Sequence, residues 1–291
     1  MDFTTGATLQ AVCEEKKISI AQAMKEREMT LGNVTEQSVM DRIGVAWKIM
    51  KDSATTPIAE PRKSIGGLIG GEAKMMKEYR ESGKNLCGEM LSRAMSYAMG
   101  VLEVNATMGL IVAAPTAGSS GVVPGALLAY QEVKGVSDEV IYNGILNASA
   151  LGYLLMRNAS VAGAEAGCQA EVGAASAMAA SALVEMEGGT PEMCLNAAAM
   201  ALSNLLGLAC DPIAGLVESP CQTRNSIGVA NAYTAAEMIL AGVKLPVPFD
   251  EMAEAMLRVG KSLPFELRET ALGGCAGTPT GCALGCKICK K

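Results

Sequence analysis

Helical patterns cover most of this 291-residue sequence, and the strict apolar–polar alternation of strands is nearly absent. From residue 137 onward the segments are rich in Ala and are separated by Gly, Pro and Asn turns, and no change in composition marks a second domain. The pattern predicts an all-α fold in a single domain, residues 1–291, with helices at 7–16, 19–30, 72–82, 86–103, 137–157, 168–187, 191–208, 223–241 and 249–261, and another that opens at 35–38 and carries Trp47 as a core anchor.

Composition limits the partners of such a fold. Apolar residues make up 50% of the chain and charged residues 19%, which is typical of a globular protein with a large core. The formal net charge is −6 and the basic residues form no cluster, so we expect no nucleic-acid partner. The uncharged runs at 104–131 and 193–210 contain Pro, Gly, Ser or Asn, and we interpret them as buried protein, not as membrane spans. The N-terminus lacks an export signal, which predicts a cytoplasmic protein.

Two segments interrupt the helical pattern with loop chemistry. Residues 56–71 contain two Pro and four Gly and include Lys63, so this segment is either a linker around a helix start or a loop that forms part of a site. Residues 105–124 contain the run Gly118-Ser-Ser-Gly121 just before an apolar helix. That run is either a flexible turn or a place where backbone N–H groups at a helix N-terminus bind an anion such as a carboxylate.

The ten Cys residues are the most chemically informative part of the sequence. In a reducing compartment they are expected as metal ligands, free core thiols or reactive thiols, not as disulfides. Cys168 and Cys221 are expected to open helices, and Cys210 to close one, so the three thiols could converge if the helices pack antiparallel. Their spacing matches no ferredoxin or zinc-finger pattern, and by spacing alone three buried core cysteines is the better interpretation. The cysteines interpreted as ordinary core thiols are Cys13, Cys87 and Cys194.

The text around these cysteines resembles a known family. The segments that carry the resemblance are Lys63-Ser64 with its Gly-rich loop, APTAGSSG at 114–121, ASVAGAEAGCQAEVG at 159–173, GLACDPIAGLVESPC at 207–221, and Arg224-Asn225. The resemblance runs through most of the chain, from residue 63 to residue 225 in these segments. They are similar to the iron–sulfur-dependent L-serine dehydratases, and specifically to the alpha subunit of the two-subunit bacterial form.

The resemblance implies a single helical catalytic domain with Gly/Pro-rich substrate loops. It also implies that Cys168, Cys210 and Cys221 hold a [4Fe–4S] cluster, and that L-serine is converted to pyruvate and ammonia without pyridoxal phosphate. Three thiolates leave one iron open, and an open iron can act as a Lewis acid toward the substrate. The expected protein partners are a beta subunit, further copies of the chain, or both. Two alternatives stay open: a cluster-bearing regulatory subunit, and a lyase for another small hydroxy- or thiol-amino acid.

The group that removes the substrate proton is not obvious, because the chain contains no His. The candidates in this chain are Lys63, Glu165 and Glu171, and the alternative is a base supplied by the beta subunit. An Arg fork suits a substrate carboxylate. The residues predicted to bind substrate are Thr116, Ser119, Ser120, Gly121, Ser160 and Arg224.

The C-terminal segment departs from the family pattern. GCAGTPTG at 274–281 resembles the family's C-terminal segment, but the chain continues through Cys282, Cys286 and Cys289. We interpret 275–291 as a flexible, Cys-rich tail. The alternatives are that a tail thiolate occupies the open iron when substrate is absent, or that the tail holds metal of its own. The radical-type use of this cysteine spacing is excluded because no barrel follows it.

Overall fold

The computed structural model describes residues 2–290 and has the predicted all-α architecture. Within this range the only β pairing is an isolated bridge between Cys210 and Arg268. The α-helices are α1 (Gly6–Lys16), α2 (Ile20–Gly32), α3 (Glu36–Ala59), α4 (Glu72–Glu81), α5 (Gly88–Ala106), α6 (Val122–Lys134), α7 (Asp138–Asn158), α8 (Gly163–Ala166), α9 (Ala174–Met186), α10 (Pro191–Asn204), α11 (Cys221–Leu240), α12 (Phe249–Ser262) and α13 (Pro279–Ile288). Short 3-10 turns lie at Ala117–Ser119 (η1), Ile213–Gly215 (η3) and Phe265–Leu267 (η4), and a π-helical turn lies at Gln169–Gly173 (η2).

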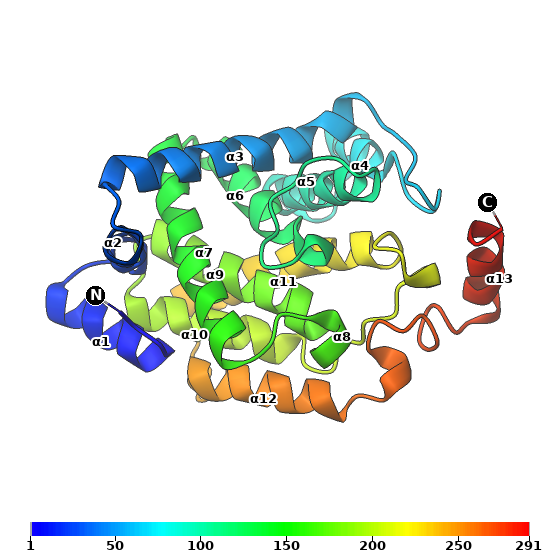
Figure 1. Ribbon diagram of the computed structural model, residues 1–291. Coiled ribbons are helices and arrows are strands. Elements are labelled where there is room, and N and C mark those ends of the chain that lie inside the picture. The colour runs from blue at the N-terminus through cyan, green and yellow to red at the C-terminus, as the bar shows by residue number, and fades with distance from the viewer. Residues whose placement is uncertain (1, 291) are drawn as a thin grey trace.

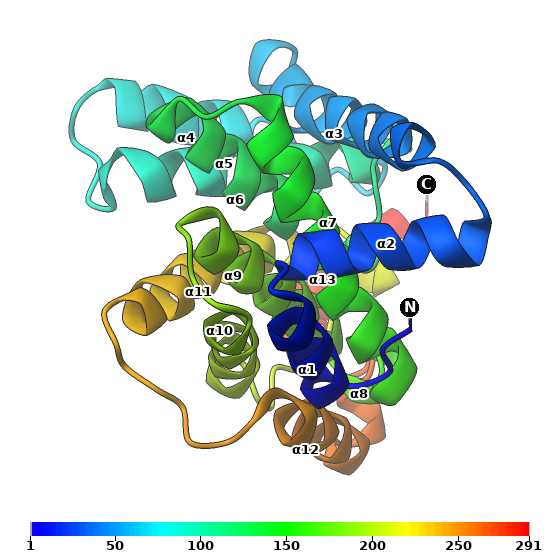
Figure 2. The same ribbon diagram turned by 90° about the vertical axis from the view of Figure 1, so that its left-hand side faces the viewer.

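The helices form two packed groups that share α9 and α11 (Figure 1). One group contains α3, α4, α5 and α6, and the other contains α10 and α12, with α7 packed on α9 and running past both. Figure 2, turned by 90°, shows α1 and α2 lying across the edge of this arrangement. All residues of α9 from Ala174 to Val184 are buried, and most of them are Ala or Ser. Such small side chains let the surrounding helices approach α9 closely, which explains its position at the centre.

Helix starts are set by the residues that the sequence pattern indicated. Ser19 caps α2 in a reciprocal capping box with Gln22, and the Thr35 hydroxyl accepts a hydrogen bond from the Ser38 amide at the start of α3. Trp47 on α3 is 1% exposed, so its predicted role as a core anchor is confirmed. In the described part of the chain, no helix is long and apolar enough to cross a membrane.

Three local predictions are wrong. The loop predicted to start at residue 56 starts later, because α3 continues to Ala59 and includes Pro57. Pro57 has no amide to donate to the Ser53 carbonyl, so the helix continues past it with one hydrogen bond fewer. The helix predicted at 191–208 ends at Asn204. Cys87 is exposed, not in the core, because it lies in the turn that leads into α5. None of the ten cysteines forms a disulfide among the described residues.

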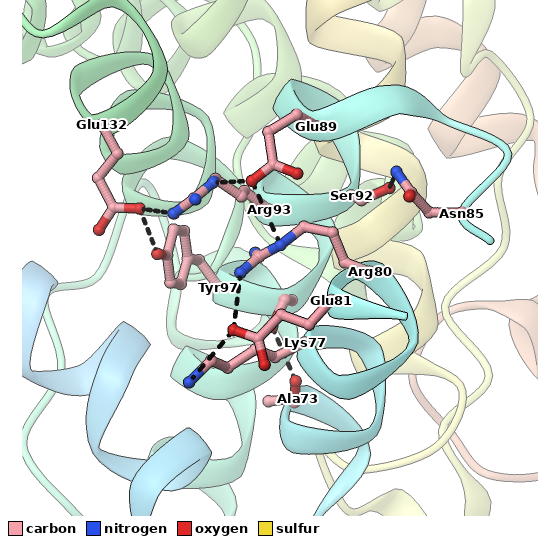
Figure 3. A network of polar contacts seen from close by, with 11 residues as sticks. Ala73, Lys77, Arg80, Glu81, Asn85, Glu89, Ser92, Arg93, Tyr97 and Glu132 are labelled. Carbon is pink, nitrogen blue, oxygen red and sulfur yellow. Dashed lines mark hydrogen bonds and ion pairs between the residues drawn. The ribbon is translucent and has the colours of Figure 1, made fainter. Parts of the chain in front are cut away.

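A polar network joins α4, α5 and α6 on the face shown in Figure 3. Arg93 of α5 pairs with Glu89 on its own helix and with Glu132 of α6, and the Tyr97 hydroxyl donates to Glu132 at 2.6 Å. Arg80 of α4 lies 3.4 Å from the same Glu89 carboxylate. The network joins α5 to α6, the two helices on either side of the loop at 107–121, and so holds both ends of that loop in place.

Asp138 provides a pH-dependent test of the packing between α3 and α7. Its pKa is lowered because the Gln131 amide donates a hydrogen bond to it at 2.7 Å, with further contributions from Trp47 Nε1 and Lys51. A lowered folded-state pKa contributes stability above the unfolded pKa, and this contribution is lost as the pH falls through the folded value. Asp138→Asn should therefore lower the free energy of unfolding at neutral pH, and the difference from the wild type should shrink below about pH 4. Urea unfolding across this pH range measures it, and a pH-independent difference would contradict the assignment.

Candidate metal centre

Cys168 is held by an irregular turn between α8 and α9. It immediately precedes the π-helical turn η2, a distortion that often marks functional sites. The side chain of the next residue, Gln169, fixes this turn: its Nε2 donates to the carbonyls of Ala166 and Met256, both at 2.9 Å, and its Oε1 accepts from the Gly207 amide at 2.8 Å. The last of these bonds draws the segment that leads to Cys210 toward Cys168.

Cys210 lies six residues beyond the end of α10, so the prediction that it closes a helix is wrong. The backbone amide of Gln169 donates to the Leu208 carbonyl at 3.1 Å. The chain between α10 and Cys210 therefore bonds to another segment and does not form a further helical turn. Cys210 then pairs with the segment after α12: its amide donates to the Leu267 carbonyl at 2.9 Å, and its carbonyl accepts from the Glu269 amide at 2.6 Å. Tertiary hydrogen bonds therefore fix the position of this thiol.

Cys221 is the first residue of α11, as predicted, where the helix dipole favours a thiolate. Asn225, one turn later, is fully buried and links this helix to the Ser-Gly segment. Its Nδ2 donates to the carbonyls of Cys221 at 2.9 Å and Gly118 at 2.8 Å, and its Oδ1 accepts from the Gly121 amide at 3.0 Å. The loop at 116–121 is thus attached to the helix that carries the third thiol.

The three thiols are buried, with exposed fractions of 4%, 3% and 8% for Cys168, Cys210 and Cys221. Burial raises the pKa of all three, that of Cys168 to about 12. Their mutual proximity also contributes, because Cys168 raises the pKa of both other thiols and Cys221 raises that of Cys210. A metal that binds these thiols must displace their protons, so metal binding here would be coupled to deprotonation of the cysteines.

Thiols are the side chains that ligate iron–sulfur clusters, and Cys168, Cys210 and Cys221 have the chemistry such a group needs. Among residues 2–290, no three Cys, Asp or Glu side chains are placed to hold one metal ion. Small residues keep space beside the thiols: a Cβ on Gly163 would lie 2.9 Å from the Cys210 Sγ and 2.5 Å from the Glu171 Oε2.

Glu171 is the predicted catalytic residue that the fold brings to the thiols. The Thr116 hydroxyl donates to its Oε1 at 2.7 Å, and its Oε2 lies 3.6 Å from the Cys210 Sγ. Burial raises the pKa of Glu171, and the nearby carboxylate of Glu269 raises it further, whereas the Thr116 hydrogen bond acts in the opposite direction. Ser119, fully buried, lies 3.1 Å from the Thr116 hydroxyl and extends this polar cluster.

Arg224 lies at the same centre, but its guanidinium is already bound. Its Nη1 donates to the Ala209 carbonyl at 2.7 Å and to the Asp211 carboxylate at 2.5 Å. Asp211 in turn accepts from the Cys275 amide at 2.6 Å, which attaches the start of the tail to the segment that carries Cys210. The positive charge of Arg224 acts against the effect of burial on the pKa of Cys168, because it favours the thiolate form.

The other predicted residues divide between the centre and its surroundings. Ser120 is fully buried and donates to the Ala117 carbonyl at 2.8 Å, so it supports the turn at η1. Ser160 donates to Glu165 at 2.7 Å, and Glu165 is half exposed and faces Lys261. Lys63 is exposed in the loop before α4, and none of its contacts reaches the three thiols. The roles of these residues remain predictions.

The tail contains a helix. In α13, the hydroxyl of Thr278 caps the first turn, and the helix packs against η3, where Gly285 approaches Ala214. Cys282, Cys286 and Cys289 are all exposed. Their spacing places them along one side of α13. The predicted flexibility of the tail stays a prediction.

Sequence reasoning gave no role to three residues of this centre. Asn225 and Asp211 lie beside predicted ligands, but nothing in a sequence tells a buried, hydrogen-bonded side chain from a solvated one. Glu269 is 59 residues from Cys210 in the chain, and only the bridge between the two segments brings it near. Its positive φ of 63° marks a constrained turn. A constrained backbone of this kind leaves no signal in the sequence at a non-glycine position.

Sequence comparison shows which known proteins this chain is similar to. The family model for the serine dehydratase alpha chain matches residues 15–276. The L-serine dehydratase alpha chain of Peptoniphilus asaccharolyticus is 47% identical over 279 residues, which cover 96% of each chain. The probable L-serine dehydratase alpha chain of Bacillus subtilis is 46% identical over 286 residues, which cover 98% of this chain and 95% of that one. An L-serine dehydratase of Escherichia coli is 35% identical over 282 residues, 94% of this chain and 62% of that longer protein. The chain belongs to the serine dehydratase alpha chain family.

Proposed function

We propose that this chain is the alpha chain of an L-serine dehydratase, which converts L-serine to pyruvate and ammonia. The observation that carries the proposal is that three buried thiols, Cys168, Cys210 and Cys221, lie close enough to couple electrostatically, with the Cys210 Sγ 3.6 Å from the partly buried carboxylate of Glu171. Membership of the serine dehydratase family supports the substrate and the type of reaction.

We infer that the three thiols would hold a [4Fe–4S] cluster, and that the enzyme uses no pyridoxal phosphate. When bound, such a cluster with three protein ligands supplies an open iron that polarises the substrate carboxylate and hydroxyl. Arg224 supports the ligands, because it favours the thiolate of Cys168 and binds the segment around Cys210 through Ala209 and Asp211.

Among the three candidate bases, Glu171 has the most suitable position for accepting the α-proton of serine. The Thr116 hydroxyl occupies its Oε1, which leaves Oε2, on the side of the Cys210 thiol, to hold a proton. Its raised pKa makes it a stronger base than a solvated carboxylate. Glu165 faces Lys261 instead, and a solvated carboxylate of that kind is a poorer proton acceptor. Ser119 and Thr116 provide hydroxyls beside the same carboxylate that can orient the substrate.

We also propose a beta chain as partner, together with a cytoplasmic location. The longer E. coli relative carries sequence beyond the part that this chain matches, and the alpha-chain relatives match end to end. A second chain would supply the part that single-chain relatives carry themselves. Such a chain could also contribute the base that removes the substrate proton. This chain contains no His, and its own candidate bases are a Lys and two Glu residues.

An anaerobic assay tests the proposal directly. The full chain, purified without oxygen and mixed with the beta chain from the same organism, should release pyruvate from L-serine, and borohydride treatment should leave the rate unchanged because no Schiff base is involved. A preparation that is brown but makes no pyruvate with the beta chain would contradict the catalytic role and favour a regulatory subunit. Turnover of another hydroxy- or thiol-amino acid in place of L-serine would contradict the substrate assignment.

A further inference from the structure

The buried carboxylate of Glu218 is not used by the proposed reaction, yet it makes an unusual number of long-range contacts. It is 2% exposed and lies three residues before Cys221. The Ser64 hydroxyl donates to its Oε2 at 2.7 Å, the Gly66 amide to its Oε1 at 2.6 Å, and the Leu68 amide to its Oε2 at 3.0 Å. All three donors belong to the loop between α3 and α4, about 150 residues away in sequence. In Figure 1 this loop lies on the same side of the molecule as α13.

The loop is shaped to enclose this carboxylate. Besides its bond to Glu218, the Ser64 Oγ accepts from the amides of Gly67 and Ile69, both at 3.2 Å, and the Ser64 amide donates to the Ile69 carbonyl at 3.1 Å. A Cβ on Gly66 would lie 2.9 Å from both Glu218 oxygens, so only glycine leaves the carboxylate room to enter. A buried carboxylate that accepts three hydrogen bonds is strongly held, because removing it would leave the donors unpaired.

The other end of Glu218 is fixed to the helix that carries Cys221. Its backbone carbonyl accepts from the Gln222 amide at 2.9 Å, in the first turn of α11. The Gln222 side chain then reaches the Glu103 Oε1 at 3.2 Å, on α5. One residue thus joins the Gly-rich loop to the element that positions the third thiol.

We propose that Glu218 is a positioning residue that latches the 64–69 loop to the N-terminus of α11, so that the loop and the Cys221 thiol are held as one unit. The part of this inference that concerns Cys221 as a ligand rests on the proposed function. The coupling between loop and helix does not, because every contact involved belongs to the chain itself. Loss of the latch should free the loop amides and expose the Cys221 thiol together.

Amide hydrogen exchange and thiol alkylation on the full chain without metal test the latch. In Glu218→Gln, the amides of Gly66 and Leu68 should exchange about tenfold faster or more, and Cys221 should react faster with a maleimide while Cys194 does not. Ser64→Ala should instead free the amide of Ile69, whose printed acceptor is the Ser64 Oγ, and leave Gly66 and Leu68 bound to the carboxylate. The Gly67 amide keeps its bond to the Ser64 carbonyl at 3.0 Å. Glu237→Gln, an exposed position on the same helix, is the matched control and should change neither readout.

The outcomes are decisive in either direction. Wild-type exchange at 64–69 and wild-type alkylation of Cys221 in Glu218→Gln would overturn the proposal, as would equal changes in Glu237→Gln. If Glu218→Gln does not fold, Ser64→Ala decides, because unchanged exchange at Ile69 would refute the loop geometry. If the exchange results are as expected but the chain binds no iron and produces no pyruvate, the latch stands and the proposed function fails.

Discussion

Replacing Cys168, Cys210 or Cys221 singly by Ala is expected to abolish both the visible absorbance of anaerobically prepared protein and its turnover of L-serine. Each of the three thiols is buried, so water does not readily take the place of a lost ligand. Loss of one of three thiolates leaves a cluster with two protein ligands, which is far less stable. Absorbance spectra and pyruvate release measure the effect.

Two other cysteines provide matched controls for this prediction. Cys194 is fully buried in α10, and Cys87 is exposed at the start of α5. Cys194→Ala and Cys87→Ala should both keep the colour and the turnover. If all three centre variants keep the colour and turnover as well, the ligand assignment is wrong.

Gly163→Ala is expected to lower the turnover of L-serine by about a hundredfold, because a small misplacement of reacting groups has an effect of this size. The added methyl would lie 2.5 Å from the Glu171 Oε2 and 2.9 Å from the Cys210 Sγ, and both atoms would have to move. The Thr116 hydrogen bond and the bridge to Arg268 oppose that movement. Steady-state kinetics of the reconstituted enzyme measure the effect.

The control for this substitution is Gly173→Ala, at the last residue of the nearby π-helical turn η2. A Cβ there meets nothing closer than 3.8 Å, and the backbone has ordinary helical angles. This variant should retain wild-type turnover. Equal losses in both variants would show that the segment is intolerant of any added methyl group, and would contradict a specific role for the space beside Glu171.

The fold was predictable where local chemistry decides it. Ser19 and Thr35 cap helices because a hydroxyl satisfies amides that a helix start leaves free, and this signal depends only on neighbouring residues. The end of α10 was not predictable in this way. Leu205, Leu206 and Leu208 are helix formers, but Gly207 has a φ of 85° and Gln169 binds the amide of Gly207 and the carbonyl of Leu208, so the glycine and this tertiary contact end the helix together.

The site was predictable only in part, because it is assembled from segments that are distant in sequence. The resemblance to a family, not the spacing, pointed to Cys168, Cys210 and Cys221. Nothing local distinguishes Glu171 from Glu165, and only the packing of Thr116 against one of them separates a buried carboxylate from a half-exposed one. The latch at Glu218 likewise depends on a loop about 150 residues away, so a single sequence contains no signal for it.

We expect three thiols of this chain to hold a four-iron cluster. The iron and acid-labile sulfide content of the full chain, prepared without oxygen, tests this most directly. The account predicts about four iron atoms and about four sulfides per chain. It also predicts that these contents fall to near zero in each of Cys168→Ala, Cys210→Ala and Cys221→Ala. Wild-type protein that contains neither iron nor sulfide after anaerobic reconstitution, or variants that retain the full content of both, would contradict it.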